Sequence, residues 1–247
     1  MPGKSTPKKP RLPQRATQEA TRFRRLLLRW FNKHGRDLPW RRTRDPYAVL
    51  VSEFMLQQTP VSRVVDYYHR FLETFPTIAS LATAPPGRVR ERWDGLGYYR
   101  RAENLHRLAK LVMDQHSGQI PDDGERLLAL PGIGRYTAGA VLSFAYERPT
   151  PAVDTNVSRV LRRAFHPRLG SGARADRRIW ATAAALLPTR GKTAWSVNQA
   201  VMELGALICT ARLARCEVCP VRAACQTGRR PGSARSAALT ASDTTPR

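Results

Sequence analysis

The sequence predicts an all-α protein. Apolar side chains recur at helical spacing along most of the chain, and almost no stretch alternates polar and apolar residues as a strand does. Short loops that contain proline or glycine separate these helical stretches, and no repeat with a solenoid period is present. The chain of 247 residues is long enough to bury a sizeable core. We expect one or two domains, or two lobes around a cleft.

The first two predicted helices carry clear sequence signals. Phe23, Leu27 and Phe31 recur at helical spacing in the first helix. In the second helix, Asp45 can cap the N-terminus and Pro46 suits the first helical position. The remaining helices are expected over about residues 61–75, 86–94, 100–116, 123–130, 135–146, 155–164, 176–187 and 194–208.

The charge of the chain favours a polyanionic partner. Lysine and arginine number 42 against 19 acidic residues, which gives a net charge of +23. Basic residues recur throughout, so nucleic acid is the natural partner, because each neutralised phosphate releases counterions. An anionic membrane surface is the alternative. Segments 1–16 and 227–247 lack periodicity, and we expect them to be disordered tails on a folded domain of residues 17–226.

The sequence shows no membrane or export signal. No apolar run approaches the roughly 20 residues of a membrane span, and the N-terminus lacks the apolar core of a signal peptide. We therefore expect a cytoplasmic, nucleoid-associated monomer that contacts no membrane. In that compartment its thiols are expected to stay reduced.

A glycine-containing turn between two predicted helices is the first functional motif. The string Leu-Pro-Gly-Ile-Gly covers residues 130–134. Glycine permits the backbone angles of so tight a turn, and the amide groups of the following helix N-terminus then point outward, where they can bind a phosphate. An ordinary helix–helix turn is the structural alternative. In so basic a chain, the string with Gly132 and Gly134 predicts a DNA-binding helix–hairpin–helix over about residues 123–146.

Two carboxylates have contrasting predicted environments. Asp154 lies at the start of a predicted helix, where the helix dipole stabilises an anion, although aspartate is also a common helix cap. Glu53 flanks an apolar stripe. It is either a solvated helix glutamate or, if buried beside Phe54 and Leu56, an acid with a raised pKa. One protonated and one ionised carboxyl is the arrangement that cleavage of a glycosidic bond requires.

The cysteines of the chain all fall in one short C-terminal loop, at Cys209, Cys216, Cys219 and Cys225. Two disulfides do not suit a reducing compartment. Four thiolates suit zinc, but zinc ribbons usually carry two Cys-x-x-Cys pairs and this loop has one. Four thiolates also suit an iron–sulfur cluster, and the spacing by itself leaves both possibilities open.

Several motifs together carry a resemblance to a known family. They cover residues 38–41, 52–59, 95–99, 130–134 and 198–200. With these motifs and the cysteine spacing, the chain resembles the helix–hairpin–helix DNA glycosylases of the endonuclease III superfamily, and within it the A/G-specific adenine glycosylases (MutY-like). The resemblance implies a two-lobed fold, a 4Fe–4S cluster held by the four cysteines, and double-stranded DNA with a mispaired or damaged base as partner.

The resemblance also implies roles for individual residues. Glu53 would protonate the adenine and serve the attacking water, and Asp154 would stabilise the oxocarbenium-like sugar. Tyr136 and Asn156 would support these two carboxylates. The residues implied to wedge into the base stack, line the base pocket or bind DNA are Trp40, Arg41, Leu56, Gln57, Gln58, Tyr98, Gly132, Gly134 and Gln199. For the aromatic residues among them, core packing is the alternative.

The resulting hypothesis is a monofunctional DNA glycosylase of base excision repair that removes adenine opposite guanine or 8-oxoguanine. A thymine or uracil mismatch glycosylase on the same scaffold is the alternative, because the sequence stops soon after Cys225 and we expect it to lack the C-terminal domain that reads 8-oxoguanine. Tyr136 occupies the position of a lysine in bifunctional relatives, so we expect little or no β-lyase activity. A catalytically silent DNA binder would not need Glu53 and Asp154 at motif positions.

Overall fold

The computed structural model describes residues 14–230. Regular structure within that range is helical, apart from one isolated bridge between Cys209 and Ala214, so the predicted all-α class is confirmed. Residues 1–13 and 231–247, which hold most of the two predicted tails, lie outside the described residues. None of the helices in the described part of the chain has the length and apolar character of a membrane-spanning helix.

The chain divides into two compact units. Unit 2 is the continuous stretch Asp37–Ala152, and unit 1 combines Met1–Arg36 with Val153–Arg247. Unit 1 is therefore formed by the two segments that precede and follow unit 2 in the sequence. The candidate carboxylates fall in different units, with Glu53 in unit 2 and Asp154 in unit 1.

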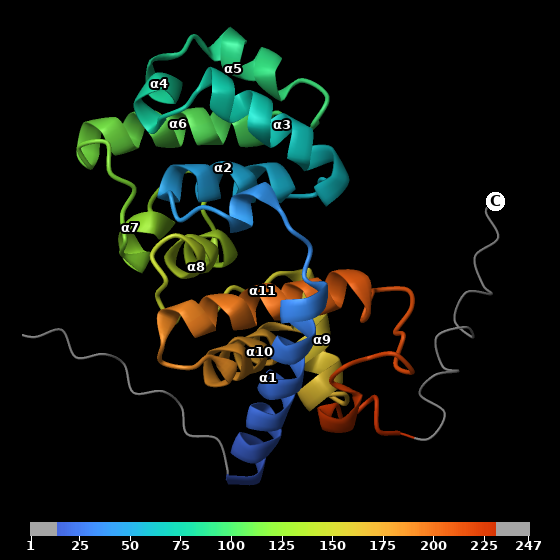
Figure 1. The fold of residues 1–247 in the computed structure, drawn as a ribbon. Helices are drawn as coiled ribbons and strands as arrows, with labels where there is room; N and C mark the ends of the chain where they lie inside the picture. The colour runs from blue at the N-terminus through green and yellow to red at the C-terminus, as the bar shows by residue number, and fades with distance from the viewer. Residues whose placement is uncertain (1–13, 231–247) are drawn as a thin grey trace, which may run out of the picture. The chain divides into compact units, whose positions relative to one another are not determined.

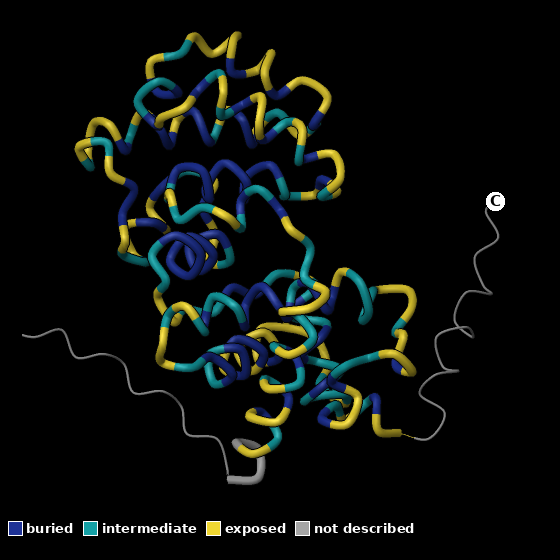
Figure 2. The backbone as a smooth tube through the Cα atoms, in the orientation of Figure 1, coloured by how far each residue is buried: buried dark blue, intermediate teal, exposed yellow. Residues whose placement is uncertain are grey.

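Unit 2 is organised around one buried helix. Its helices are η1 (Pro39–Arg41), α2 (Pro46–Leu56), α3 (Val61–Thr74), α4 (Ile78–Thr83), α5 (Pro86–Trp93), α6 (Arg100–Gln115), α7 (Gly124–Leu128) and α8 (Arg135–Phe144). Figure 1 shows α2 between α6 and α8, and α2 packs against both of them and against α3. Residues of α2 from Tyr47 to Met55 are all buried (Figure 2), and most of them are apolar, as expected for a helix at the centre of a core; Ser52 and Glu53 are the polar exceptions.

Local signals account for the starts of two helices in unit 2. Asp45 Oδ1 accepts a hydrogen bond from the Tyr47 N–H at 3.0 Å and Pro46 is the first residue of α2, so the predicted cap is confirmed. Helix α4 lies outside the ranges that the apolar spacing predicts. Thr77 and Ser80 form a reciprocal capping box at its start, and this pair is the sequence signal that marks so short a helix.

Unit 1 packs one long helix against elements from both parts of its chain. Its helices are α1 (Gln14–His34), α9 (Thr155–Phe165), α10 (Ala173–Leu186), α11 (Gly191–Leu207) and η2 (Arg222–Ala224). Helix α11 packs against α1 and α9. The Arg36 guanidinium donates to both carboxylate oxygens of the fully buried Glu203, at 2.8 and 3.0 Å. This two-pronged ion pair ties the end of α1 to α11 just before the chain enters unit 2.

Two glycines allow the backbone of one segment to approach another closely. A Cβ atom on Gly139 of α8 would lie 2.2 Å from the carbonyl oxygen of Pro151. A Cβ atom on Gly205 of α11 would lie 2.7 Å from Cβ of Asn156 at the start of α9. Since protein interiors are close-packed, neither position accepts a larger residue without displacement of its neighbour.

Candidate active site

The helix–hairpin–helix lies within unit 2 and consists of α7, a turn over residues 129–134, and α8. Asp123 caps α7 by accepting hydrogen bonds from the N–H groups of Glu125 and Arg126, both at 3.1 Å. Gly132 has φ +80°, and a Cβ atom there would lie 2.8 Å from the ring of Phe54. The turn therefore packs directly on α2, and only glycine satisfies both the backbone angle and the space.

The N-terminus of α8 is suited to bind an anion. Gly134 is its N-cap residue and has no side chain that could cap the helix. The dipole of the helix adds positive potential at the same place. Tyr136 is the second residue of α8 and is partly buried. The hairpin thus has the geometry that the sequence predicts for a phosphate site.

Glu53 lies in the interior of unit 2. Its relative exposure is 4%, and the neighbouring Ser52 is 1% exposed. Ser52 Oγ donates to the carbonyl of Val49 at 2.7 Å, so this neighbouring hydroxyl is occupied by the helix itself. A solvated helix glutamate, the alternative left open by the sequence, does not describe this position. Burial disfavours the charged form of a carboxyl group, which suits Glu53 to proton donation.

The two candidate wedge residues share an unusual backbone conformation. Gln58 has φ +57° and Tyr98 has φ +48°, which is the left-handed region that non-glycine residues rarely adopt. Both side chains are exposed, and Tyr98 is 62% exposed although it is aromatic. Strain of this kind persists where the surrounding structure fixes it and is frequent at functional sites. Two loop tips of unit 2 therefore present a polar and an aromatic side chain to the outside.

Arg101 holds these two loop tips together. It is 7% exposed and its guanidinium donates to the carbonyl of Met55 at 2.8 Å, to that of Gly97 at 2.9 Å and to that of Gln57. Its Cζ atom also lies 5.6 Å from the centre of the Tyr98 ring. This buried role of Arg101 was not predicted from the sequence, because arginines in so basic a chain indicate a surface that faces DNA.

The remaining candidates for the base pocket are distributed over both units. Trp40 is 7% exposed and lies within the core of unit 2. Its ring packs edge-on against the ring of Tyr68, and the two ring centres are 5.5 Å apart. Arg41 and Leu56 are partly exposed in the same unit. Gln199 is buried in α11, in unit 1. For Trp40 the core packing that was the alternative interpretation is what the structure records.

Asp154 is the N-cap residue of α9. Its Oδ1 accepts a hydrogen bond from the N–H of Val157 at 2.7 Å, and its Oδ2 accepts one from Asn156 Nδ2 at 2.9 Å. Each of the two carboxylate oxygens therefore accepts one hydrogen bond from a neighbouring residue of the chain. The carboxylate of Asp154 is therefore held in one orientation at the start of α9.

Hydrogen bonds continue from Asp154 to the cysteine loop. Arg159 Nη2 donates to Asn156 Oδ1 at 2.7 Å, and Arg159 Nε donates to the carbonyl of Cys209 at 2.8 Å. Arg163 Nη1 lies 3.4 Å from the sulfur of Cys209. Arg159 and Arg163 are thus partly buried, and they connect α9 to the cysteine loop. They therefore contribute less to a basic outer surface than exposed arginines would.

All four cysteines line one small cavity in unit 1. Its volume is about 30 Å³, and its wall also contains Phe23 and Val160. Burial raises the pKa of the Cys219 thiol to about 12, and the other sulfurs add to that shift. Among the described residues, no three side chains of His, Cys, Asp or Glu gather as a single metal ion requires. The four cysteines therefore line one site.

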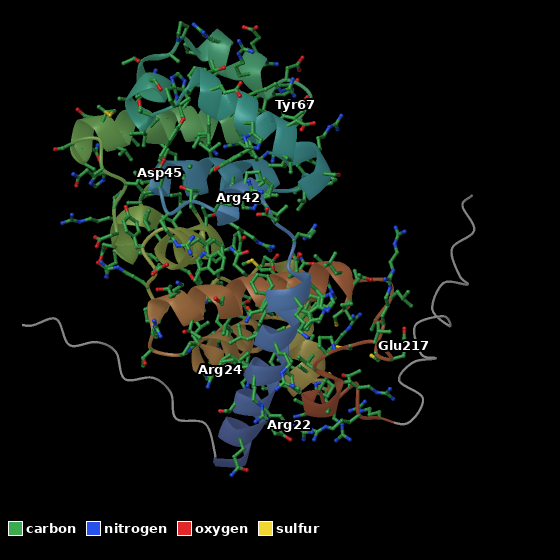
Figure 3. The ribbon with its side chains drawn as sticks, viewed as in Figure 1. Arg22, Arg24, Arg42, Asp45, Tyr67 and Glu217 are labelled. Atoms are coloured by element: carbon green, nitrogen blue, oxygen red, sulfur yellow. The ribbon has the colours of Figure 1, made fainter. Side chains whose placement is uncertain are left out.

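The loop over residues 209–225 also carries exposed cations. Arg212, Arg215 and Arg222 are exposed. Glu217, labelled in Figure 3, is the single acidic residue of the loop. This loop therefore has the charge needed to contact a polyanion.

A comparison with known families places the chain. The model for the HhH-GPD superfamily of base excision DNA repair proteins matches residues 51–181. The chain belongs to this superfamily. The matched residues include Glu53, the hairpin and Asp154, and the resemblance that the sequence motifs carry is confirmed together with the predicted helix–hairpin–helix fold.

Similar proteins are known from bacteria and mammals. The adenine DNA glycosylase of Mycobacterium tuberculosis (strain H37Rv) is 48% identical over 196 residues, which cover 79% of this chain and 64% of that protein. The adenine DNA glycosylase of Rattus norvegicus is 42% identical, with 90% and 44% covered. This chain thus spans less than two thirds of either relative. A solved structure of a thermostable thymine-DNA glycosylase has a TM-score of 0.77 at 29% identity and covers 85% of this chain and 96% of its own.

Proposed function

We propose that this protein is a monofunctional DNA glycosylase that excises adenine mispaired with guanine or 8-oxoguanine during base excision repair. The observation that carries the proposal is Glu53, a carboxyl group buried in the central helix of unit 2 beside the helix–hairpin–helix. Identity with the two adenine glycosylases is 48% and 42%, against 29% with the thymine enzyme, which favours adenine over thymine.

The proposed reaction uses the two carboxyl groups differently. Glu53 donates a proton to the adenine as the bond between the base and C1′ of the sugar breaks, and the bonding electrons leave with the base. The ionised Asp154 stabilises the positive charge that develops on the sugar. Water then adds to C1′ and gives its proton to the Glu53 carboxylate, which restores the starting state. Asn156 orients Asp154 through its hydrogen bond of 2.9 Å.

The DNA contacts follow from the outward-facing groups. The N-terminus of α8 would bind a backbone phosphate, and Gln58 and Tyr98 would enter the base stack where the adenine leaves. The exposed arginines of the loop 209–225 would also contact backbone phosphates. The protein would act as a monomer on chromosomal double-stranded DNA.

A 4Fe–4S cluster is the proposed cofactor. All four cysteines line one cavity whose wall is otherwise largely apolar, and four thiolates are a donor set that suits such a cluster. Cys209, Cys216, Cys219 and Cys225 would hold it. When bound, the cluster would supply a structural anchor for the basic loop. Protein purified without oxygen is expected to contain iron and little zinc, and metal analysis with the reverse result would contradict the assignment.

The decisive experiment is an excision assay on duplexes that contain A:8-oxoguanine, A:G, T:G or U:G. We expect cleavage after alkali only for the two adenine substrates. The variant Glu53→Gln is expected to abolish excision with DNA binding retained, and Asp154→Asn to lower the rate roughly 10²–10³-fold. Glu91→Gln, which changes an exposed glutamate of α5, is the matched control. Excision confined to T:G and U:G would replace the proposal by the mismatch glycosylase that the thymine-DNA glycosylase structure favours.

Lyase activity is tested with borohydride. Tyrosine at position 136 cannot form an imine with the sugar, so we expect an intact abasic strand and no covalent trapping by the wild-type protein. The variant Tyr136→Lys is the positive control, because it tests whether an amine at position 136 can be trapped on the sugar. Trapping of the wild type that equals trapping of this variant would contradict the assignment.

A further inference from the structure

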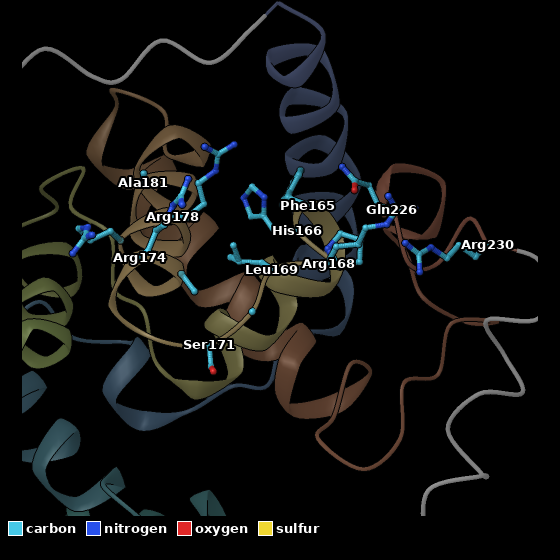
Figure 4. A pocket seen from close by; sticks show the side chains of 14 residues that line it. Phe165, His166, Arg168, Leu169, Ser171, Arg174, Arg178, Ala181, Gln226 and Arg230 are labelled. Carbon is cyan, nitrogen blue, oxygen red and sulfur yellow. The ribbon is translucent and has the colours of Figure 1, made fainter.

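An arginine-lined pocket lies in unit 1 at the far end of α9 from Asp154. The pocket has a volume of about 920 Å³ and is formed by the α9–α10 loop, the first turns of α10 and residues that follow Cys225 (Figure 4). Asp154 precedes α9, and Phe165 in the pocket wall is the last residue of this 11-residue helix. The helix is about 16 Å long, so the pocket is distinct from the candidate catalytic carboxylate.

The ionisable groups of the pocket wall are basic. Arg168, Arg174, Arg177, Arg178 and Arg230 contribute to the wall, and no described residue that lines the pocket carries a carboxylate. All five arginines are exposed, and none of them forms an ion pair within residues 14–230. Like charges that converge on one volume without counter-charges create a strongly positive potential there. Binding of an anion would relieve this repulsion.

The pocket wall is held in place by the protein itself. Arg162 Nη1 donates to the carbonyl of Leu169 at 2.7 Å, which fixes the loop that leads to α10. His166 Nε2 lies 2.7 Å from Thr182 Oγ1, which fixes the ring in the pocket wall, where Figure 4 shows it between Arg178 and Arg168. Burial lowers the pKa of His166, and the positive charge of Arg178 lowers it further. The site is therefore preformed and positive.

The N-terminus of α10 lies in sequence between the pocket residues Ser171 and Arg174. Gly172 is its N-cap residue, has φ +99° and forms no side-chain cap, so the first N–H groups of a 14-residue helix remain available. Arg174, Arg177 and Arg178 follow at spacings that place them on one side of the helix. Asp176 lies in the same turn but does not line the pocket. Three guanidinium groups of α10 thus line one volume.

We propose that this pocket binds phosphate groups, supplied either by a nucleic-acid backbone or by a free polyphosphate. Guanidinium groups match the geometry of phosphate oxygens with two parallel hydrogen bonds. The volume lies within the range of roughly 300–1,000 Å³ that is typical of ligand pockets. The proposal concerns binding outside the candidate active site and does not depend on which base the enzyme removes.

The test uses a double variant and a control of equal charge. Arg174→Gln/Arg178→Gln removes two cations from the pocket, and Arg25→Gln/Arg29→Gln removes two exposed cations from α1 outside it. Inorganic pyrophosphate is titrated by calorimetry, and an undamaged duplex is titrated by fluorescence anisotropy over a salt series. Each lost phosphate contact lowers the slope of log Kd against log salt by about 0.9 and weakens binding roughly tenfold near 0.1 M salt.

The two probes distinguish the source of the phosphate. If about two phosphate contacts are lost, the duplex affinity of the pocket variant falls by about 10- to 100-fold. Such a loss in the pocket variant alone assigns the site to nucleic acid. Loss of pyrophosphate binding alone assigns the site to a free polyphosphate. Equal behaviour of the pocket and control variants with both probes would overturn the proposal, as would binding of a poly-glutamate peptide in place of either probe. If the pocket variant does not fold, Arg168→Gln/Arg177→Gln serves as the second pair. Single-turnover excision at saturating enzyme tests the glycosylase proposal separately.

Discussion

Replacement of Arg101 by lysine is expected to destabilise unit 2 without changing the net charge. The guanidinium donates to carbonyl oxygens at the end of α2 and in the loop before α6, namely those of Phe54 at 3.0 Å, Met55 at 2.8 Å, Leu96 at 3.1 Å and Gly97 at 2.9 Å. A lysine ammonium has three donors on one atom and cannot span acceptors that the planar guanidinium reaches with separate nitrogens. Several buried carbonyl groups would therefore lose their donor.

The size of the effect follows from the lost hydrogen bonds. A hydrogen bond to a charged group contributes about 1.5–3 kcal/mol, and a buried acceptor left without a donor carries its desolvation penalty. If lysine retains about half of the contacts, the free energy of unfolding falls by roughly 3–5 kcal/mol. This is a large part of the total stability of about 5–15 kcal/mol that is usual for a protein domain.

Urea unfolding compares Arg101→Lys with Arg100→Lys, which changes the adjacent exposed arginine in the same way. The control is expected to stay within about 0.5 kcal/mol of the wild type. Single-turnover excision should also fall for Arg101→Lys, because the loop tips that carry Gln58 and Tyr98 lose their common anchor. Equal unfolding midpoints and equal excision rates for the two variants would refute the reasoning.

Three further perturbations test other parts of the molecule. Asn156→Ala removes the donor to Asp154 Oδ2 and should lower single-turnover excision about 10- to 100-fold with a smaller change in the urea midpoint; an unchanged rate would contradict the orienting role. Gly139→Ala should lower the free energy of unfolding by about 1–3 kcal/mol, whereas Gly134→Ala, which meets no neighbour within 4 Å, should not. Burial, and then a nearby lysine, lower the pKa of His106, so the folded state keeps it neutral while the unfolded chain takes up a proton below about pH 6.5. Thermal stability should therefore decline from pH 7.5 to 5.5, and His106→Gln should flatten that decline; a decline of equal size in the variant would show that other groups cause it.

The sequence predicts local features of this molecule well. The cap at Asp45, the hairpin around Gly132 and the single loop that holds the cysteines depend on neighbouring residues, and each is found where the local pattern indicates. Helix α4 was harder to predict, because its apolar residues are too few to show a period.

Long-range burial is what the sequence hides. Arg101 was interpreted as surface charge, although it occupies the same stripe of α6 as the buried Leu105, Leu108 and Val112. Helical spacing therefore indicates that this arginine points inward, but two of the acceptors that make its burial tolerable, Phe54 and Met55, lie more than 40 positions away in the sequence. Arg159 has the same character, since its partner Cys209 lies 50 residues further along the chain.

The order of the units along the chain has a consequence for synthesis on the ribosome. Unit 2 is one uninterrupted stretch, so it can complete its core as soon as Ala152 has emerged. Helix α1 appears first but must wait for α11, and Arg36 meets Glu203 only after 167 further residues have been added. At about 5–20 residues per second this wait lasts roughly 10–30 s. During that time Phe23 and Leu27, which are fully buried in the finished protein, face solvent and chaperones.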